Sequence, residues 1–309
     1  MKIKNFAILK GNGEIKDEAI IYKSSEVQKT PENEEKLRNN VLDLSKYKIL
    51  NVRSEKTFKG GTISFKIRAK SKNTGALLVL KAQNGSNVQC GPTLTEHKFA
   101  IAKADDGGDN WRATIIVGDI LNYDLSSGIE IKVHVEGSSI HLYVENILLC
   151  EAQAAIKESP IEFRLCSDAD FEIFNVDISE TRPKIFVVMQ FSKEYDELYS
   201  DIIIPVSEAF GYECVRGDEF YSGTPILKDI VDSILKCAAI IAEITPDNPN
   251  VFYEIGYAHA IGKPTILLCD RVRSKLPFDL SGFRTLFYDN TIAGKSKVEQ
   301  SLRKYFENF

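Results

Sequence analysis

The chain has 309 residues, of which 43% are hydrophobic and 27% are charged, and a formal net charge of −5. This composition is typical of globular domains and excludes wholesale disorder and fibrous repeats, while the length favours two domains of about 100–200 residues each. The acidic balance argues against a broad nucleic-acid-binding face, and no apolar run approaches the roughly 20 residues that a membrane span needs.

The start of the chain and the cysteines predict in which cellular compartment the protein is found. The N-terminal stretch MKIKNFAILKGNG contains lysines, but Gly11 interrupts it before a signal-peptide core forms. No C-x-x-C pair occurs, and most cysteines lie within apolar runs, so they are predicted to be buried free thiols in a reducing cytoplasm. The six are Cys90, Cys150, Cys166, Cys214, Cys237 and Cys269.

Up to about residue 180 the dominant hydrophobic period is two. Ile129–Glu136 and Ile140–Glu145 alternate apolar and polar side chains around a Gly-Ser-Ser turn, and Ile63–Ala69 does the same. Strict alternation predicts half-buried antiparallel strands. Many short strands separated by glycine-containing turns predict a β-sandwich of the jelly-roll type. A weak helical pattern covers only residues 31–41.

Beyond residue 183, strands and helices alternate. The predicted strands are Ile185–Met189, Tyr212–Val215, Ala238–Ile244, Thr265–Cys269 and Thr285–Tyr288. The predicted helices are Glu194–Phe210, one marked by Ile226, Ile230 and Ile234, Val251–Ile261, and one from Lys295 onward. Because the strands are apolar on both faces, they predict a parallel, doubly wound sheet with flavodoxin-like strand order. Pro205 should kink the first helix or mark its last turns.

The polar, proline-ended stretch Glu180-Thr181-Arg182-Pro183 separates the two patterns. We therefore predict a β-sandwich domain over residues 1–180 and an α/β domain over residues 183–309.

Polar residues gather at three strand exits of the predicted parallel sheet. Ligands of open α/β sheets bind beyond the carboxyl ends of the strands, where strand order reverses, between the first and third strands in flavodoxin-like order. The candidate ligand contacts at these exits are Gln190, Phe191, Ser192, Asp218, Glu243, Asp247, Asn248 and Asn250.

The stretch NPNVFYEIGYAHAIGKP, residues 248–264, carries the most information. Asn248 can cap a helix with Pro249 at its first position, and Asn250 is an alternative cap. Gly262 is expected to end that helix. Glu254 then lies one to two turns in, near the positive helix end, which favours its carboxylate form. Tyr253 is free to stack on a base.

Several segments in this order resemble nucleoside 2-deoxyribosyltransferase-like proteins and bacterial Toll/interleukin-receptor-like (TIR-like) proteins. The segments are VVMQF, RGDE, IIAEIT, the element E-x-G-x-A-x-x-x-G-K-P and TILL, within about residues 183–309. The resemblance implies that Glu254 is the catalytic residue, acting on the bond between a ribose C1′ and a base nitrogen. It also matches a loop acid or amide to either Asp247 or Asn248.

The implied activities differ in what the glutamate does. In the transferases it attacks C1′, and in the TIR-like NAD hydrolases it supports departure of nicotinamide. The transferases also use a neighbouring subunit's C-terminus, for which this sequence has no matching element.

Cleavage of an N-glycosidic bond is consistent with these residues even without the family resemblance. Cleavage of an N-glycosidic bond builds positive charge on the ribose, which a fixed carboxylate near C1′ stabilises or traps. No metal or cofactor is expected, with NAD entering as substrate. The histidines have no ligand spacing; they are His97, His134, His141 and His259.

The first domain resembles concanavalin-like or laminin-G-like sandwiches. The resemblance lies in Trp111 and the segments IEIKVHVEG, IHLYVENILLCEAQ and IEFRLCSDADFEIFNVDI. It implies a sugar, peptide or protein partner, or an oligomerising role.

Two classes of function follow. The first is a nucleotide N-glycosidase: a TIR-like NAD hydrolase acting as a regulated bacterial defence or stress effector, with a nucleoside 2-deoxyribosyltransferase as the alternative. The second is a non-catalytic nucleotide sensor or signalling adaptor. The resemblance implies self-association through the TIR-like domains; we expect a cytoplasmic protein without nucleic-acid or membrane partners.

Overall fold

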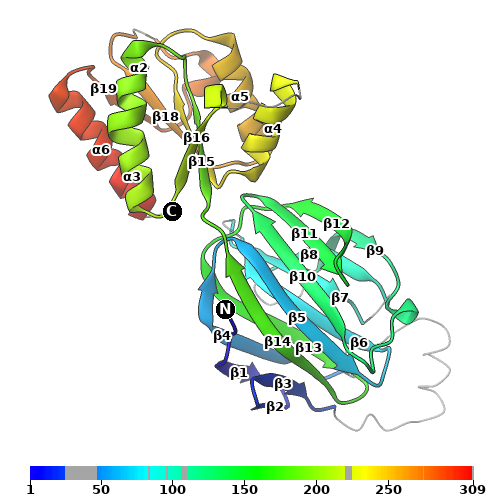
Figure 1. Ribbon diagram of the computed structural model, residues 1–309. Coiled ribbons are helices and arrows are strands. Elements are labelled where there is room, and N and C mark those ends of the chain that lie inside the picture. Colours follow the sequence, from blue (N-terminus) through cyan, green and yellow to red (C-terminus); the bar gives the residue numbers. More distant parts are fainter. Residues whose placement is uncertain are drawn as a thin grey trace. The chain divides into compact units, whose positions relative to one another are not determined.

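The computed structural model describes residues 1–24, 47–82, 84–94, 97–105, 110–219, 225–273 and 275–307. The chain divides into two compact units (Figure 1). The sandwich unit comprises Met1–Val135 and Ser139–Thr181, and the α/β unit comprises Glu136–Ser138 and Arg182–Phe309. The helix predicted over residues 31–41 lies outside the described residues.

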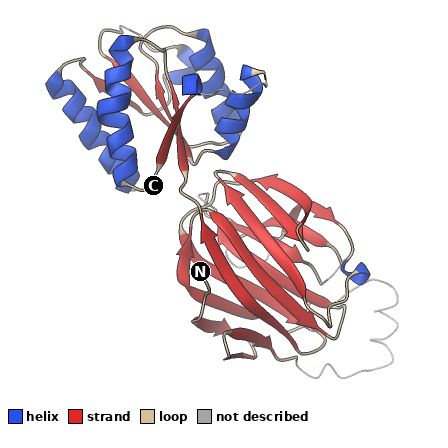
Figure 2. Ribbon diagram, in the orientation of Figure 1, coloured by secondary structure: helices blue, strands red, loops and turns tan. Residues whose placement is uncertain are grey.

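The described part of the sandwich unit forms two seven-stranded sheets (Figure 2). One has the order β1 (Phe6–Lys10), β4 (Leu50–Phe58), β13 (Ser159–Ser167), β6 (Thr74–Lys81), β7 (Asn87–Pro92), β8 (Phe99–Ala104), β9 (Arg112–Val117). The other has the order β12 (Ile147–Gln153), β11 (Ser139–Val144), β10 (Ile129–Glu136), β5 (Gly61–Ala69), β14 (Phe171–Glu180), β3 (Ala19–Tyr22), β2 (Gly13–Lys16). A 3-10 turn, η2 (Ile120–Asn122), joins β9 to the strands that follow.

The period-two pattern explains the sandwich. In β10 every second side chain, from Ile129 to Val135, is buried, and the residues between them are partly exposed. Strand β10 pairs antiparallel with β5, placing Val133 opposite Ile63. Across the core, the Phe65 and Phe163 rings of the two sheets meet edge to face, with centroids 5.1 Å apart. The predicted antiparallel β-sandwich is therefore confirmed.

The described α/β unit is built on a five-stranded parallel sheet. Its order is β16 (Glu213–Arg216), β15 (Lys184–Val188), β17 (Ala239–Glu243), β18 (Thr265–Asp270), β19 (Thr285–Tyr288). The helical segments are α2 (Lys193–Leu198), the π-helical η3 (Tyr199–Ile203), α3 (Ile204–Ala209), η4 (Gly217–Glu219), α4 (Ile226–Lys236), α5 (Pro249–Ala260), η5 (Phe278–Leu280) and α6 (Ile292–Glu307). None of the described helices is long and apolar enough to cross a membrane.

Continuously apolar strands bury both faces of this sheet. In β15, Ile185 and Val187 join the core beneath α2, α3 and α6, whereas Phe186 and Val188 join the core beneath α4 and α5 (Figure 1). The predicted parallel sheet is confirmed. Strand order reverses between β15 and β17, so their carboxyl ends flank the place where such sheets bind ligands.

Several predicted elements differ from the structure at their ends: α5 begins at Pro249 and not at Val251, and α6 begins at Ile292 and not at Lys295. Two further differences have a local physical reason. The single helix predicted over Glu194–Phe210 is three consecutive segments, with a π turn in which the Ile204 N–H bonds the Tyr199 carbonyl. Pro205 follows directly and has no N–H to continue the α-helical pattern. The second strand runs over Glu213–Arg216 because the Tyr212 N–H donates to the Ser207 carbonyl of α3 at 3.0 Å and not to the sheet; the Tyr212 ring stacks on Phe306 at 5.2 Å.

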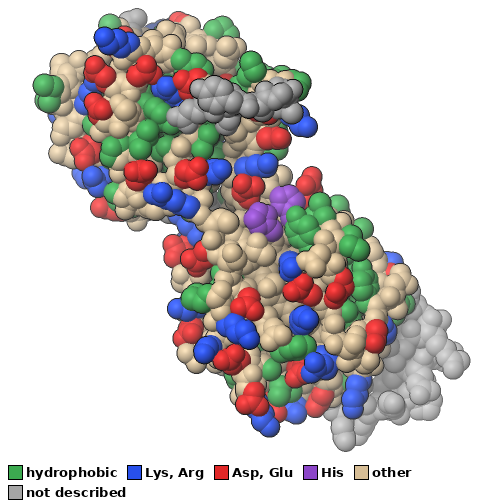
Figure 3. Space-filling view, in the orientation of Figure 1, with side chains coloured by type: hydrophobic (Ala, Val, Ile, Leu, Met, Phe, Trp, Pro, Cys, Tyr) green, Lys and Arg blue, Asp and Glu red, His purple; other side chains and the backbone are tan. Residues whose placement is uncertain are grey.

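All six cysteines are free thiols. Cys90, Cys150, Cys237 and Cys269 are buried as predicted, while Cys166 and Cys214 are partly exposed. On the face drawn in Figure 3, cationic and anionic side chains are interspersed and form no broad basic patch.

Candidate active site

The start of α5 is fixed by local chemistry that the sequence predicts. The Asn248 side-chain oxygen accepts a hydrogen bond from the Asn250 N–H at 3.0 Å, so Asn248 is the cap, with Pro249 at the first helical position. Gly262 follows the helix with a φ of +69°, the left-handed conformation that ends helices. The alternative cap, Asn250, instead lies within the first turn.

A pocket of about 410 Å³ opens at the carboxyl end of β15, between the starts of α4 and α5. Small-molecule sites commonly have about 300–1,000 Å³. The lining residues are Phe186, Val187, Val188, Met189, Phe191, Gly217, Ile226, Leu227, Ile230, Asn248, Asn250, Val251, Tyr253 and Glu254. A single carboxylate and two amides therefore face a mainly apolar wall, and no lysine, arginine or histidine is among the described residues that line it.

Glu254 carries the one carboxyl group among the described residues that line this pocket. Its side chain is partly buried, and burial raises the pKa of its carboxyl to about 7. Among the described residues, none forms a hydrogen bond or ion pair with this carboxyl. The sequence-based expectation that the helix dipole favours the carboxylate is wrong here. The dipole acts mainly within the first turn, and Glu254 lies beyond it, where desolvation dominates.

The structure brings half of the predicted site together. Phe191, Asn248, Asn250, Tyr253 and Glu254 all line the pocket. The other predicted contacts, Gln190, Ser192, Asp218, Glu243 and Asp247, are not among its lining residues. Most of these five have a structural role instead.

Glu243 is held inside the sheet. Its side chain is buried, with 1% of the residue exposed, and accepts hydrogen bonds from the Thr245 N–H at 2.8 Å and from the Thr245 hydroxyl. The Tyr288 hydroxyl donates to its other oxygen at 2.9 Å. Burial raises the pKa of Glu243 to about 7 despite these bonds. This carboxyl therefore joins β17 to β19 and does not reach the pocket.

Asp247 points to a different partner. Its Oδ1 lies 2.6 Å from an Nη of Arg273, and the Arg273 side chain also donates to the Ile244 and Thr245 carbonyls. Of the two residues that the family resemblance left open, Asn248 and not Asp247 lies at the pocket.

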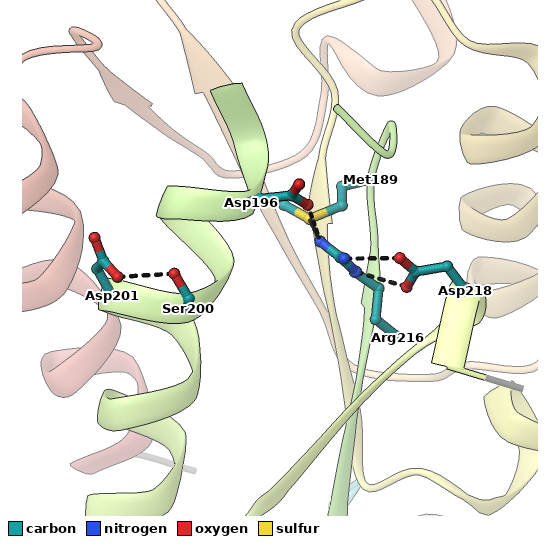
Figure 4. Close-up of polar contacts among 6 residues, drawn as sticks. All are labelled: Met189, Asp196, Ser200, Asp201, Arg216 and Asp218. Carbon is teal, nitrogen blue, oxygen red and sulfur yellow. Dashed lines mark hydrogen bonds and ion pairs between the residues drawn. The ribbon is translucent and has the colours of Figure 1, made fainter. Parts of the chain in front are cut away.

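Asp218 is occupied by Arg216, which the sequence did not single out (Figure 4). The Arg216 Nε and Nη2 donate to the two Asp218 carboxylate oxygens, each at 2.7 Å. Ser192 is the residue before α2 and makes no side-chain cap bond, and Gln190 is partly buried beside it. These three residues border the site without lining it.

Most of the apolar side chains that line the pocket were not predicted from the sequence. Met189 ends the first predicted strand, and Ile226 and Leu227 begin α4, where they are 73% and 54% exposed. Apolar residues at the start of a helix pattern look the same whether they enter a core or a pocket. Only their exposure to solvent, which the structure shows, indicates that they line a pocket.

The described residues contain no group of three or more His, Cys, Asp or Glu side chains that could hold a metal ion. The described residues that line the pocket supply one carboxyl group, two amides and aromatic faces.

No protein-family model matches the chain, and no curated protein matches it. Among solved structures, the carbohydrate-binding module CBM66 from Bacillus subtilis is 12% identical with a TM-score of 0.41, covering 56% of this chain and 94% of that one. A Bacillus licheniformis beta-glucanase is 14% identical with a TM-score of 0.33, covering 43% and 72%. The Clostridium botulinum CMP N-glycosidase BcmB is 24% identical with a TM-score of 0.32, covering 40% and 98%. All three TM-scores are below 0.5, so the functional conclusion depends on the pocket itself.

Proposed function

We propose that the α/β unit is a nucleotide N-glycosidase that uses Glu254 to cleave the bond between a ribose C1′ and a base nitrogen, with NAD as the substrate. The observation that carries this proposal is a carboxyl group without a partner among the described residues, set in an apolar pocket at the switch point of a parallel sheet. A group with a strongly perturbed pKa in such a cleft is a candidate for catalysis.

The reaction needs little beyond this carboxylate. As the C1′–N bond breaks, its electron pair leaves with the base and positive charge develops on the ribose ring. A carboxylate near C1′ stabilises that charge in a site of low dielectric, or bonds to C1′ until water replaces it. The water oxygen ends on C1′, and its proton is released.

The lining favours a base that carries a positive charge. Glu254 supplies negative charge, Phe191 and Tyr253 supply aromatic faces, and no described lining residue is cationic. Aromatic faces and a carboxylate attract cations. Nicotinamide is a cation while bound to ribose in NAD and is neutral once it leaves, so its departure requires no proton. Neutral purine and pyrimidine bases leave readily only when protonated.

The other polar and aromatic residues have positions suited to holding the substrate. The Asn248 side chain already caps α5, and its amide N–H group can donate to a ribose hydroxyl. Asn250 lies one turn earlier than Glu254 on the same helix, and its amide is exposed. Tyr253 and Phe191 are 51% and 54% exposed at the pocket, where a ring can stack.

Incubation of the full chain with separate substrates tests the proposal. NAD, CMP and deoxycytidine with a free acceptor base are each supplied, and products are resolved chromatographically. We expect nicotinamide from NAD, and its release is abolished by Glu254→Gln. Glu208→Gln on α3, which is exposed and belongs to a helix on the opposite face of the sheet from α4 and α5, is the matched control and keeps full activity. Base exchange from deoxycytidine would instead identify a transferase, and binding without products would identify a sensor.

A further inference from the structure

Arg216 ties together the segments that form one wall of the pocket. It is the last residue of β16, and its side chain is only 11% exposed. Besides its two bonds to Asp218, its Nη1 donates to an Asp196 carboxylate oxygen on α2 at 2.7 Å (Figure 4). The same nitrogen lies 3.8 Å from the Met189 sulfur. Every nitrogen of the guanidinium therefore has an acceptor.

The guanidinium also lies over two aromatic rings. Its central carbon lies 4.5 Å from the Tyr199 ring centroid and 5.4 Å from that of Phe191. Both distances are within the range of cation–π contacts. Tyr199 is buried in the π turn, whereas Phe191 is half exposed. The guanidinium thus connects the buried Tyr199 ring to the Phe191 ring, which fewer neighbouring residues cover.

Met189 and Phe191, which Arg216 contacts, and Gly217, which follows it in the chain, belong to the pocket wall. Met189, Phe191 and Gly217 line the pocket, and Arg216 does not. A methyl group placed on Gly217 would lie 3.5 Å from the Phe191 ring, so this ring packs against the turn that Arg216 anchors.

We propose that Arg216 is a positioning residue that sets ligand affinity by holding Phe191 and Met189 in the pocket wall. Two carboxylates neutralise its charge, so it does not act as an anion site for the substrate. Arginine is required because only a planar guanidinium can bond one carboxylate through two nitrogens and stack on rings at the same time. The kinetic part of this inference rests on the proposed N-glycosidase function.

Steady-state kinetics of a double-mutant cycle tests the coupling. Arg216→Lys should raise KM about tenfold, equivalent to about 1.4 kcal/mol, with kcat changed by less than about twofold. Phe191→Ala should have a similar effect. If Arg216 acts through Phe191, the double variant should be no worse than the more affected single variant. Multiplicative effects, or a fall in kcat at constant KM, would overturn the assignment.

Fluorine NMR tests the positioning without any need for turnover. The full chain is labelled with fluorophenylalanine, and the Phe191 signal is identified by its loss in Phe191→Leu. In Arg216→Lys this signal should move toward the position of solvent-exposed fluorophenylalanine. An unchanged signal would overturn the proposal, even if no substrate were cleaved by the wild-type protein.

Two further variants control for folding. Arg303→Lys makes the same chemical change in an exposed pair with Glu299 on α6, and should alter neither KM nor the Phe191 signal. If Arg216→Lys does not fold, Asp218→Asn removes the charge of the bidentate acceptor and should produce a smaller shift in the same direction. No shift in a folded Asp218→Asn protein would contradict the proposal.

Discussion

Replacing Glu254 by glutamine should make the α/β unit more stable at high pH while abolishing its activity. Burial raises the pKa of this carboxyl from 4.5 to about 7. A folded-state pKa above the unfolded value means that the protonated form is preferred in the folded state. The contribution of Glu254 to stability is therefore fully present below about pH 4.5 and is lost as pH rises through about 7.

The size of the effect follows from the same values. A pKa of about 7 in place of 4.5 corresponds to about 3 kcal/mol at 1.36 kcal/mol per pKa unit. Because the carboxyl is partly exposed, solvent screens part of this cost, and we expect about 1–2 kcal/mol. Glutamine does not titrate, so Glu254→Gln should match the wild type near pH 4.5 and exceed it by this amount near pH 8. Glu243 titrates in both proteins and cancels from the difference.

Urea unfolding of the full chain at several pH values measures this difference. The only tryptophan, Trp111, lies in the sandwich unit, so its fluorescence reports that unit and provides an internal control. Helical circular dichroism follows the α/β unit, which holds α2 to α6. Glu208→Gln should leave both transitions unchanged. A stability difference that stays constant with pH would mean that Glu254 is equally solvated in the folded and unfolded states, and would contradict the raised pKa of its carboxyl.

Glu254, the cap of α5 and the buried Glu243 can each be tested by substitution or by a change of pH. The wild-type kcat/KM should rise with pH through about 7, because the free enzyme needs Glu254 as a carboxylate; a fall over this range, in a pH–rate profile, would indicate a general acid instead. Asn248→Ala should cost about 1 kcal/mol in urea unfolding by removing the cap, whereas Asn250→Ala should raise KM at unchanged stability; equal stability losses would contradict the observed cap. Glu243→Gln should destabilise the α/β unit by about 1–3 kcal/mol, measured by the same unfolding, because one of the two acceptor oxygens becomes an NH2 group that cannot accept from the buried donors of Thr245 or Tyr288; unchanged stability would rule out its role in joining β17 to β19.

Features set by neighbouring residues could be predicted from the sequence. The alternating side chains of β10 predict one buried face, and Asn248-Pro249 with Gly262 predicts both ends of α5. In each case the deciding interaction lies within a few residues along the chain. The both-face burial of β15 likewise follows from its unbroken apolar run.

Features set by distant residues could not be predicted. The sequence predicts both Glu243 and Glu254 at the site. Glu254 does face the pocket that β15 and α4 complete, whereas Glu243 is enclosed by Tyr288, which lies far along the chain. From the sequence alone, Arg216 is predicted only to be a charged residue at the end of a strand. Its role depends on Asp196 of α2 and on Tyr199 of the π turn, both distant from it in the sequence.

The rate of nicotinamide release from NAD, compared with release of the dihydronicotinamide from its reduced form, shows whether Glu254 acts on a positively charged base. The two substrates differ by one hydride, which removes the positive charge of the base and leaves the rest of the molecule unchanged. We predict cleavage of the oxidised form by the wild-type protein, little or none of the reduced form, and none of either by Glu254→Gln. Equal cleavage of both forms would contradict the role of the charged base. Cleavage by a folded Glu254→Gln protein would contradict the assignment of Glu254 as the catalytic carboxylate.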